Sequence, residues 1–258
     1  MHRHNDPATA FSLEGKLAIV TGGGTGLGFA MASCFIAAGA RVVVTGRRTD
    51  ILEDAVSRLG ENAFAEPHDV TDGEEASALL ERIEKRHGAP ALLVNNAGTH
   101  VKKRLEDTSQ QDFQSILATH LGGAFSMTRA AVPLMKQAGG GSVIFIASMS
   151  SLIGMPQIVA YSAAKAGYLG MVRSLASELG PHQIRVNAIA PGWIETPMLK
   201  KALSGDPQRE QKILSRTPQQ RFGSPEDIGW CAVFLSSPAA SFINGAVIPV
   251  DGGASIGF

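Results

Sequence analysis

Cysteine is scarce in this sequence, and its placement excludes two common kinds of site. The 258 residues include only two cysteines, Cys34 and Cys231, which lie far apart and belong to no C-x-x-C pair. A disulfide framework or a zinc site requires more cysteines or a closer spacing. We therefore expect both cysteines to be small buried side chains without a redox role, and we expect no metal site.

Charged residues are also few, and their signs balance. The chain carries 23 basic and 23 acidic residues, which together make up 18% of the sequence. A net charge of zero provides no overall field that would attract a polyanion. Nucleic acid is therefore not an expected partner.

The sequence lacks the long apolar segments of membrane and secreted proteins. The stretch 137–164 has no formal charge over 28 residues, but a run of three glycines, several serines and Pro156 interrupt it. The first ten residues are polar and lack the apolar core of a signal peptide. We expect a cytoplasmic protein that does not bind a membrane, with residues 1–11 as a mobile N-terminal tail.

Glycine, in contrast, is abundant. The chain has 29 glycines, which exceeds the average share of roughly 7%. No glycine recurs at every third position, which excludes collagen, and a hydrophobic content of 44% excludes a disordered linker. The glycines must therefore meet a local requirement of the backbone.

Short apolar runs alternate with segments of helical periodicity from residue 16 to residue 250. This alternation predicts an α/β fold, a doubly wound parallel sheet of about seven strands with helices on both faces. No repeat or linker divides the chain, so residues 12–258 are expected to form one Rossmann-type domain. The expected strands are 17–21, 42–45, 63–65, 92–95, 143–147, 185–189 and 246–250.

A glycine-rich turn follows the first expected strand. Residues 22–28 read GGGTGLG and lead directly into a helical segment. In such a turn, backbone N–H groups and the start of the helix can approach a pyrophosphate closely. A tight turn without a ligand accounts for one or two glycines, but not for five in seven residues. The expected cofactor contacts here are Gly22, Gly24, Thr25, Gly26, Leu27 and Gly28.

The order of the motifs resembles that of the short-chain dehydrogenase/reductase family. The turn reads T-G-x-x-x-G-x-G, and N-N-A-G at 95–98, Ser148, Y-x-x-x-K at 161–165 and P-G at 191–192 follow. Segments 11–16, 146–150 and 187–191 look like the gluconate and deoxygluconate dehydrogenases and also like the 3-oxoacyl carrier-protein reductases. The resemblance spans about residues 12–258 and implies an oxidoreductase that acts on CH–OH groups with a nicotinamide cofactor.

The second expected strand ends in glycine followed by Arg47 and Arg48. An NAD enzyme would carry an acidic residue there to bind the ribose 2′-hydroxyl. A carboxylate repels a 2′-phosphate, whereas a guanidinium pairs with it. We predict NADP(H) as the cofactor, with Arg47 as the main contact and Arg48 as an auxiliary. Two solvated arginines at the start of a loop are the alternative.

The family resemblance implies the remaining cofactor contacts. It places Asp69 and Val70 beside the adenine ring. It also places Asn95 and the backbone of Ala97 and Gly98 beneath the ribose. The segment 191–196 would clamp the nicotinamide through Pro191, Gly192, Ile194 and Thr196.

Hydride transfer at a carbinol carbon also moves a proton at the oxygen, so the site needs an acid–base group. The pKa of a tyrosine is ordinarily about 10, and Lys165 lies one helical turn after Tyr161. A nearby cation lowers the pKa of an acid by about 1–3 units, which would bring the phenol into use near neutral pH. Lys165 is also expected at the nicotinamide ribose, by family resemblance, and Ser148 at the substrate oxygen.

One position departs from the family pattern. In its N-x-x-G-x-F segment the family has a catalytic asparagine, where this chain has His120. The resemblance implies that the backbone carbonyl of this residue holds a water in a proton relay to the lysine. A histidine keeps that carbonyl, so we expect activity to survive. A direct proton role for the imidazole and an impaired enzyme are the alternatives.

Residues 197–222 correspond to the substrate lid of the family. They carry six basic and two acidic residues, a net charge of about +4. Positive charge suits a sugar acid, or the phosphopantetheine arm and acidic carrier of a 3-oxoacyl thioester, as the ketone or secondary-alcohol substrate. Solvated side chains on a mobile helix are the alternative.

The C-terminal residues 250–253 read VDGG and are similar to segments that pack in the tetramers of the family. We therefore expect a homotetramer. A different class of function also uses this fold, namely a non-catalytic regulator that binds NADP. Such proteins usually lose the tyrosine or the lysine, and this chain keeps both.

Overall fold

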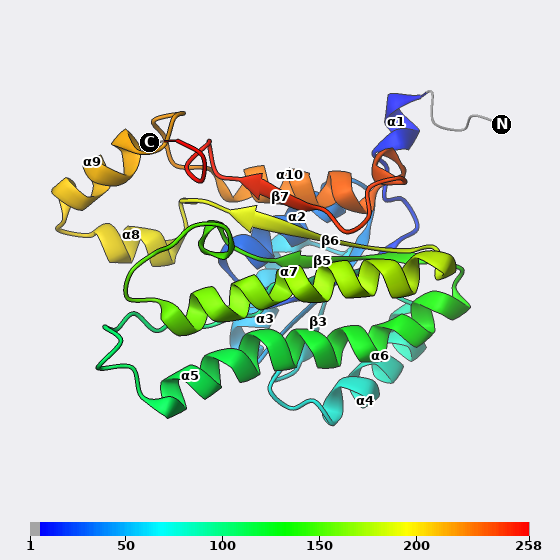
Figure 1. The fold of residues 1–258 in the computed structure, drawn as a ribbon. Helices are drawn as coiled ribbons and strands as arrows, with labels where there is room; N and C mark the ends of the chain where they lie inside the picture. Colours follow the sequence, from blue (N-terminus) through cyan, green and yellow to red (C-terminus); the bar gives the residue numbers. More distant parts are fainter. Residues whose placement is uncertain (1–5, 258) are drawn as a thin grey trace.

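Seven parallel strands form one central sheet (Figure 1). The computed structural model describes residues 6–257. The strand order is β3-β2-β1-β4-β5-β6-β7, so the direction of winding reverses between β1 and β4. The predicted doubly wound α/β fold is confirmed. The strands are β1 (Leu17–Thr21), β2 (Arg41–Gly46), β3 (Ala63–Pro67), β4 (Leu92–Asn95), β5 (Gly141–Ile146), β6 (Ile184–Pro191) and β7 (Val247–Val250).

Helices connect the strands and cover both faces of the sheet. Strand β1 is buried along its whole length, which explains its unbroken run of apolar residues. The longer helices are α2 (Gly26–Ala37), α3 (Thr49–Leu59), α4 (Glu75–His87), α5 (Gln110–Leu117), α6 (Gly123–Gln137), α7 (Val159–Leu179), α9 (Pro207–Ser215) and α10 (Pro225–Ser236). The shorter ones are α1 (Pro7–Ala10), α8 (Pro197–Leu203), the π-helix η1 (Ala118–Gly122) and the 3-10 helices η2 (Met149–Ser151), η3 (Gly180–His182) and η4 (Pro238–Ala240).

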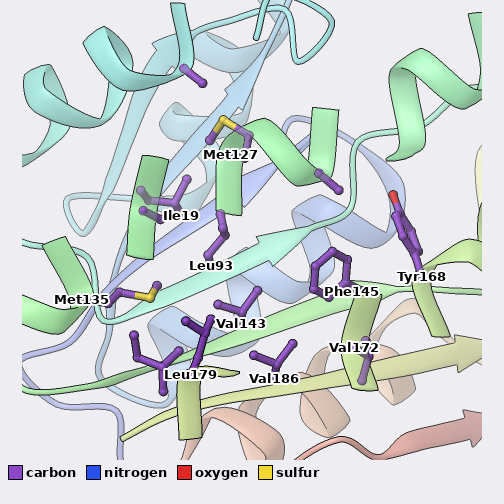
Figure 2. Close-up of a cluster of buried hydrophobic side chains, with 14 of the residues drawn as sticks. Ile19, Leu93, Met127, Met135, Val143, Phe145, Tyr168, Val172, Leu179 and Val186 are labelled. Carbon is purple, nitrogen blue, oxygen red and sulfur yellow. The ribbon is translucent and has the colours of Figure 1, made fainter. Parts of the chain in front are cut away.

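Two large apolar clusters form most of the core, one on each face of the sheet, and a smaller cluster lies between α5 and α7. The first joins the sheet to α4, α6 and α7, and Figure 2 shows side chains of this cluster, among them Phe145 and Tyr168. The second joins the sheet to α2, α3 and α10, and Phe35 lies fully buried in it. Burial of one such large side chain contributes about 1.5–3 kcal/mol to folding. The rigid sheet between the clusters therefore holds the strand ends in place.

The strand ends lie level with one another, which brings the connecting turns together. Thr21 at the end of β1 pairs with Thr45 of β2, and its neighbour Val20 pairs with Val94 of β4. The connections that follow β1, β2 and β4 therefore meet at one edge of the sheet. In doubly wound folds this edge is where ligands bind.

The expected N-terminal tail and the uncharged stretch 137–164 both contain regular secondary structure. Within the expected N-terminal tail, α1 begins at the capping residue Asp6 and buries Ala10, while residues 1–5 lie outside the described part of the chain. The uncharged stretch 137–164 contains β5, η2 and the start of α7. No helix in residues 6–257 combines the length and apolar character needed to cross a bilayer.

Candidate active site

A cavity of about 1270 Å³ opens at the carboxyl ends of the strands. Its walls come from the connections after β1, β2, β3, β4, β5 and β6, together with helix α9. All of the predicted catalytic and cofactor residues line this cavity, with the single exception of Asn95. The parallel sheet thus brings together motifs that lie far apart in the sequence.

The glycine turn between β1 and α2 is shaped by the absence of side chains. Gly22 and Gly26 have φ angles of +65° and +53°, which other residues rarely adopt. A Cβ atom at Gly28 would lie 2.2 Å from the carbonyl oxygen of Gly22. Helix α2 begins here, and its N-cap residue Thr25 makes no side-chain capping bond, so the first N–H groups are free to face an anion. The turn therefore fits the pyrophosphate of a dinucleotide.

Asn96 secures this turn, a role that the sequence reasoning did not assign. Its Nδ2 donates to the carbonyl oxygens of Thr21 at 2.9 Å and Gly22 at 3.2 Å. The hydroxyl of Thr21 in turn accepts from the backbone N–H groups of Asn96 and Ala97, each at 3.0 Å. The end of β4 is thereby tied to the glycine turn.

Asn95, expected beneath the ribose, does not line the cavity. Asn95 is 1% exposed, and its Nδ2 donates to the hydroxyl of Thr128 on α6 at 2.9 Å. Successive side chains at a strand end point to opposite sides. The side chain of Asn95 is therefore directed into the core, and that of the next residue, Asn96, faces the cavity.

Two arginines line the cavity beyond the end of β2. Arg47 lies 4.0 Å from Asp69, measured from Nη1 to Oδ2, and its side chain is 67% exposed. Partial burial raises the pKa of Asp69, but hydrogen bonds from Thr71 and the charge of Arg47 outweigh this effect and hold that pKa below its usual value. Arg48 is the N-cap residue of α3. This part of the cavity therefore combines two exposed guanidinium groups with one carboxylate.

The segment after β6 forms the opposite wall. A Cβ atom at Gly192 would lie 2.6 Å from Cα of Asp251, so only glycine fits between β6 and the C-terminal segment. Ile194 pairs with Gly223 in an isolated bridge, and Thr196 caps α8 by accepting from the backbone of Leu199 at 3.2 Å. These contacts connect the wall to the lid helices.

Ser148, Tyr161 and Lys165 converge where β5 and α7 meet. The hydroxyl of Ser148 accepts from the backbone N–H of Ser150 at 3.1 Å, which leaves its own proton for another partner. Its hydroxyl also stabilises the ionised form of Tyr161. Lys165 is 3% exposed and donates to the backbone carbonyl of Ile146. The three side chains thus present two hydroxyls and one amine to the same cavity.

The pKa values of this group differ from the expectation. Burial raises the pKa of Tyr161, and the Ser148 hydroxyl opposes that rise only in part. Burial also lowers the pKa of Lys165 to about 7, so the amine holds only part of its positive charge at neutral pH. The expected lowering of the Tyr161 pKa by Lys165 is therefore not seen.

His120 lies in the π-helical turn η1 between α5 and α6 and is 2% exposed. Its Nε2 lies 2.8 Å from the carbonyl oxygen of Thr99 and 3.3 Å from the backbone nitrogen of the same residue. Burial and then the charge of Lys165 lower the pKa of His120 to about 3. The imidazole is therefore neutral near pH 7, which argues against a direct role as a proton donor. A Cβ atom at Gly98 would lie 2.3 Å from this ring.

The sequence reasoning missed two aromatic side chains near Tyr161. The ring of His100, in the loop after β4, lies 4.9 Å from the ring of Tyr161 between centroids. The hydroxyl of Tyr168 donates to the backbone carbonyl of His120 at 3.1 Å. That carbonyl, expected to hold a relay water, thus accepts a bond from the protein. The spacing of Tyr168, three residues after Lys165 on one helix, was the available signal.

Residues 197–222, the expected lid, contain α8 and α9, which lie at one end of the sheet (Figure 1). Five of their six basic residues divide into two groups, while the side chain of Lys201 lies outside the described part of the chain. Arg221 pairs with Asp227 at 3.2 Å and Lys200 with Glu195 at 3.9 Å, and neither lysine nor arginine of these pairs lines the cavity. The side chains of Arg209, Lys212 and Arg216 do line it. Positive charge is therefore concentrated along one face of α9.

The family follows from a match over most of the chain. Residues 22–255 match the family model described as enoyl-(acyl carrier protein) reductase. The chain belongs to the short-chain dehydrogenase/reductase family. This family comprises oxidoreductases that act on CH–OH groups with a nicotinamide cofactor, and the glycine turn described above fits such a group.

Relatives within the short-chain dehydrogenase/reductase family cover nearly the whole chain. An NADP-dependent (R)-specific alcohol dehydrogenase of Lentilactobacillus kefiri is 37% identical over 93% of this chain and 97% of its own. A 2-dehydro-3-deoxy-D-gluconate 5-dehydrogenase of Escherichia coli is 38% identical over 95% and 97%. The crystal structure of a gluconate 5-dehydrogenase from Burkholderia cenocepacia, in complex with NADP and tartrate, has a TM-score of 0.94 at 30% identity and covers 98% of this chain and 100% of that one.

Proposed function

We propose that the protein is an NADP(H)-dependent oxidoreductase that transfers a hydride between nicotinamide and a ketone or secondary alcohol. The observation that carries this proposal is the convergence of Ser148, Tyr161 and Lys165 in the cavity that the glycine turn also lines. The preference for NADP rests on Arg47 and Arg48, which lie where a 2′-phosphate would be bound. No carboxylate occupies the end of β2 to repel that phosphate.

When bound, the cofactor would supply or accept the hydride. Side chains of the protein bind the oxygen of the substrate and exchange its proton. Ser148 donates a hydrogen bond to that oxygen through its hydroxyl proton, which the contact with the N–H of Ser150 leaves available. Tyr161 exchanges the proton with the oxygen. Its raised pKa keeps the phenol protonated at neutral pH, which suits proton donation during reduction of a ketone. In its charged state, Lys165 stabilises the phenolate that results.

The substrate proposed here is anionic, with a sugar acid as the first candidate. Arg209, Lys212 and Arg216 follow one another at helical spacing on the cavity side of α9, together with the buried Ile213. The acidic residue of this helix, Glu210, does not line the cavity. The sugar-acid names of two relatives support this choice. The same cations would also suit a 3-oxoacyl thioester on an acidic carrier. We propose that residues 197–222 act as the substrate lid.

A nicotinamide absorbance assay over a substrate panel tests the function. We expect NADPH to be consumed with keto forms of sugar acids, or with 3-oxoacyl thioesters, at a kcat/KM at least about 10-fold above that for uncharged ketones of similar size, because one charge-assisted hydrogen bond is worth roughly 1.5–3 kcal/mol. Equal rates for charged and uncharged ketones would remove the case for an anionic substrate. If no compound is reduced although NADPH binds, the alternative of a non-catalytic NADP-binding regulator gains support.

Substitutions on α9 extend this test. Lys212→Ala and Arg216→Ala are expected to raise the KM for the preferred acid by about 10-fold and to leave that for an uncharged ketone unchanged. Gln211→Ala is the matched control, because Gln211 is exposed on the same helix and does not line the cavity.

We also propose that the protein is a homotetramer. Strand β7 is an edge of the sheet. The apolar side chains of Phe242, which precedes it in the chain, and Ile256, which follows it, are 102% and 83% exposed. An open strand edge flanked by apolar groups is normally covered. Light scattering is expected to give four times the 27.0 kDa mass of one chain. The mass of a single chain would contradict the proposal.

A further inference from the structure

Lys165 is a buried amine without an acidic partner. Within residues 6–257, no carboxylate forms an ion pair with it, and burial is the cause that lowers its pKa. The backbone carbonyl of Ile146 accepts one of its hydrogen bonds. An amine whose pKa lies near neutrality is sensitive to every weak contact that favours its charged form. The side chains beside Nζ therefore decide how much charge faces Tyr161.

Tyr168 supplies such a contact. Its ring centroid lies 4.7 Å from Nζ of Lys165, closer than the 5.6 Å to the ring of Tyr161. The Tyr168 side chain is 1% exposed and packs on Phe145, with 5.2 Å between ring centroids (Figure 2). A cation over an aromatic face is stabilised most when water is excluded. The ring of Tyr168 thus favours the charged state of Lys165.

The hydroxyl of Tyr168 has a separate partner. It donates to the backbone carbonyl of His120, in the π-helical turn η1. The imidazole of His120 is held from the other side by the backbone of Thr99. Irregular turns of this kind are frequent at functional sites and must be held by their surroundings. Tyr168 therefore connects the irregular turn to the helix that carries both Tyr161 and Lys165.

We propose that Tyr168 is a positioning residue for the reaction: its ring face supports the charged amine of Lys165, and its hydroxyl holds His120 in place beside Tyr161. The proposal rests on the proposed function, in which Lys165 stabilises the phenolate of Tyr161. Tyr168 acts through Lys165 and does not contact the substrate.

Few other titratable groups face Lys165 or Tyr161. The ring of His100 lies 4.9 Å from that of Tyr161, and burial lowers the pKa of His100. His120 on η1 is close enough for its pKa to respond to the lysine, and it is neutral. On the remaining elements packed against α7, Asp112 of α5 pairs with Lys103 at 2.7 Å, and Arg185 of β6 bonds the carbonyl of Leu235 at 2.6 Å. The titratable residue of η3, His182, is exposed. Loss of the Tyr168 ring is therefore expected to reduce the charge of Lys165, to destabilise the phenolate and to raise the apparent pKa of Tyr161.

The chain has only two tyrosines, which permits a direct measurement. In both Tyr168→Phe and Tyr168→Leu, Tyr161 is the single tyrosine, so the near-ultraviolet absorbance of phenolate reports its ionisation without any turnover. With NADP⁺ bound, we expect Tyr161 to titrate about 1 pH unit higher in the Leu variant, which lacks the ring, than in the Phe variant, which keeps it. Equal titration in the two folded variants would overturn the role of the ring.

A matched control separates this effect from simple loss of packing. The control carries Phe145→Leu together with Tyr168→Phe. It removes an aromatic ring from the same core cluster, but Lys165 lies over the ring of Tyr168 and not over that of Phe145. We expect lower thermal stability and an unchanged titration of Tyr161. A shift as large as that of Tyr168→Leu would assign the effect to packing and overturn the proposal. If Tyr168→Leu does not fold, Tyr168→Met takes its place with the same expected shift.

The hydroxyl is tested by kinetics. Tyr168→Phe is expected to lower kcat about 5-fold, the order of one lost hydrogen bond, and to leave the KM for NADP(H) unchanged. An unchanged kcat would overturn this part of the proposal. If the parent protein reduces no substrate, the proposed function fails, whereas the phenolate titration still decides whether the Tyr168 ring acts on Lys165 and Tyr161.

Discussion

Tyr161→Phe is expected to abolish turnover, with a fall in kcat of about 10²–10⁴-fold, while NADP(H) binding stays measurable. The substitution removes one oxygen from a side chain that lies beside Ser148 and one helical turn from Lys165. General acid–base catalysis contributes an effect of this size. The ring of phenylalanine keeps the packing, so stopped-flow kinetics and a cofactor-binding titration on the folded protein measure the chemistry alone.

The other tyrosine of the same helix provides the comparison. Tyr168→Phe also removes one buried hydroxyl from α7, but from a group that contacts the backbone of His120. Its expected loss of about 5-fold is far below that of Tyr161→Phe. Activity of Tyr161→Phe within 10-fold of the parent would refute the assignment of Tyr161 as the proton donor.

Replacement of Arg47 and Arg48 together by alanine is expected to raise the KM for NADPH by at least about 100-fold. Each charge-assisted hydrogen bond to a 2′-phosphate is worth roughly 1.5–3 kcal/mol, and both guanidinium groups line the cavity. NADH has no 2′-phosphate, so its KM is expected to change little. Initial rates with each cofactor at a fixed, saturating substrate concentration measure the two values.

A matched control for these arginines is Arg173→Ala. Arg173 is exposed on α7 and does not line the cavity, so its loss removes one positive charge without any effect on either cofactor. A parent protein that favours NADH over NADPH would contradict the cofactor assignment. Equal losses for both cofactors in the double variant would instead indicate a general role of the arginines in the shape of the cavity.

The features that the sequence placed correctly depend on interactions between residues that are close together in the chain. The glycine turn depends on the backbone of seven consecutive residues, and each required φ angle or close approach is a local constraint. The two arginines follow their strand directly, so their place at its end needed only the position of β2. Tyr161 and Lys165 share a face of α7 through helical spacing alone.

The features that the sequence reasoning missed depend on contacts between distant segments. The direction of the Asn95 side chain is set by the hydroxyl of Thr128, 33 residues away. The contact of Tyr168 with His120 spans 48 residues, and only the packing of α7 on η1 creates it. The ion pairs of Lys200 and Arg221, which do not line the cavity, likewise require the positions of Glu195 and Asp227.

The electrostatics of the catalytic group belong to the tertiary structure for the same reason. Spacing places an amine one helical turn from a phenol and predicts that the amine lowers the pKa of the phenol. Folding buries both, and the removal of water raises the pKa of Tyr161 and lowers that of Lys165 to about 7. The sequence by itself thus determined the family, the sheet and the residues proposed as the reacting groups. Their charge states were decided only by the packed core, because desolvation depends on everything that surrounds a group and not on its neighbours in the chain.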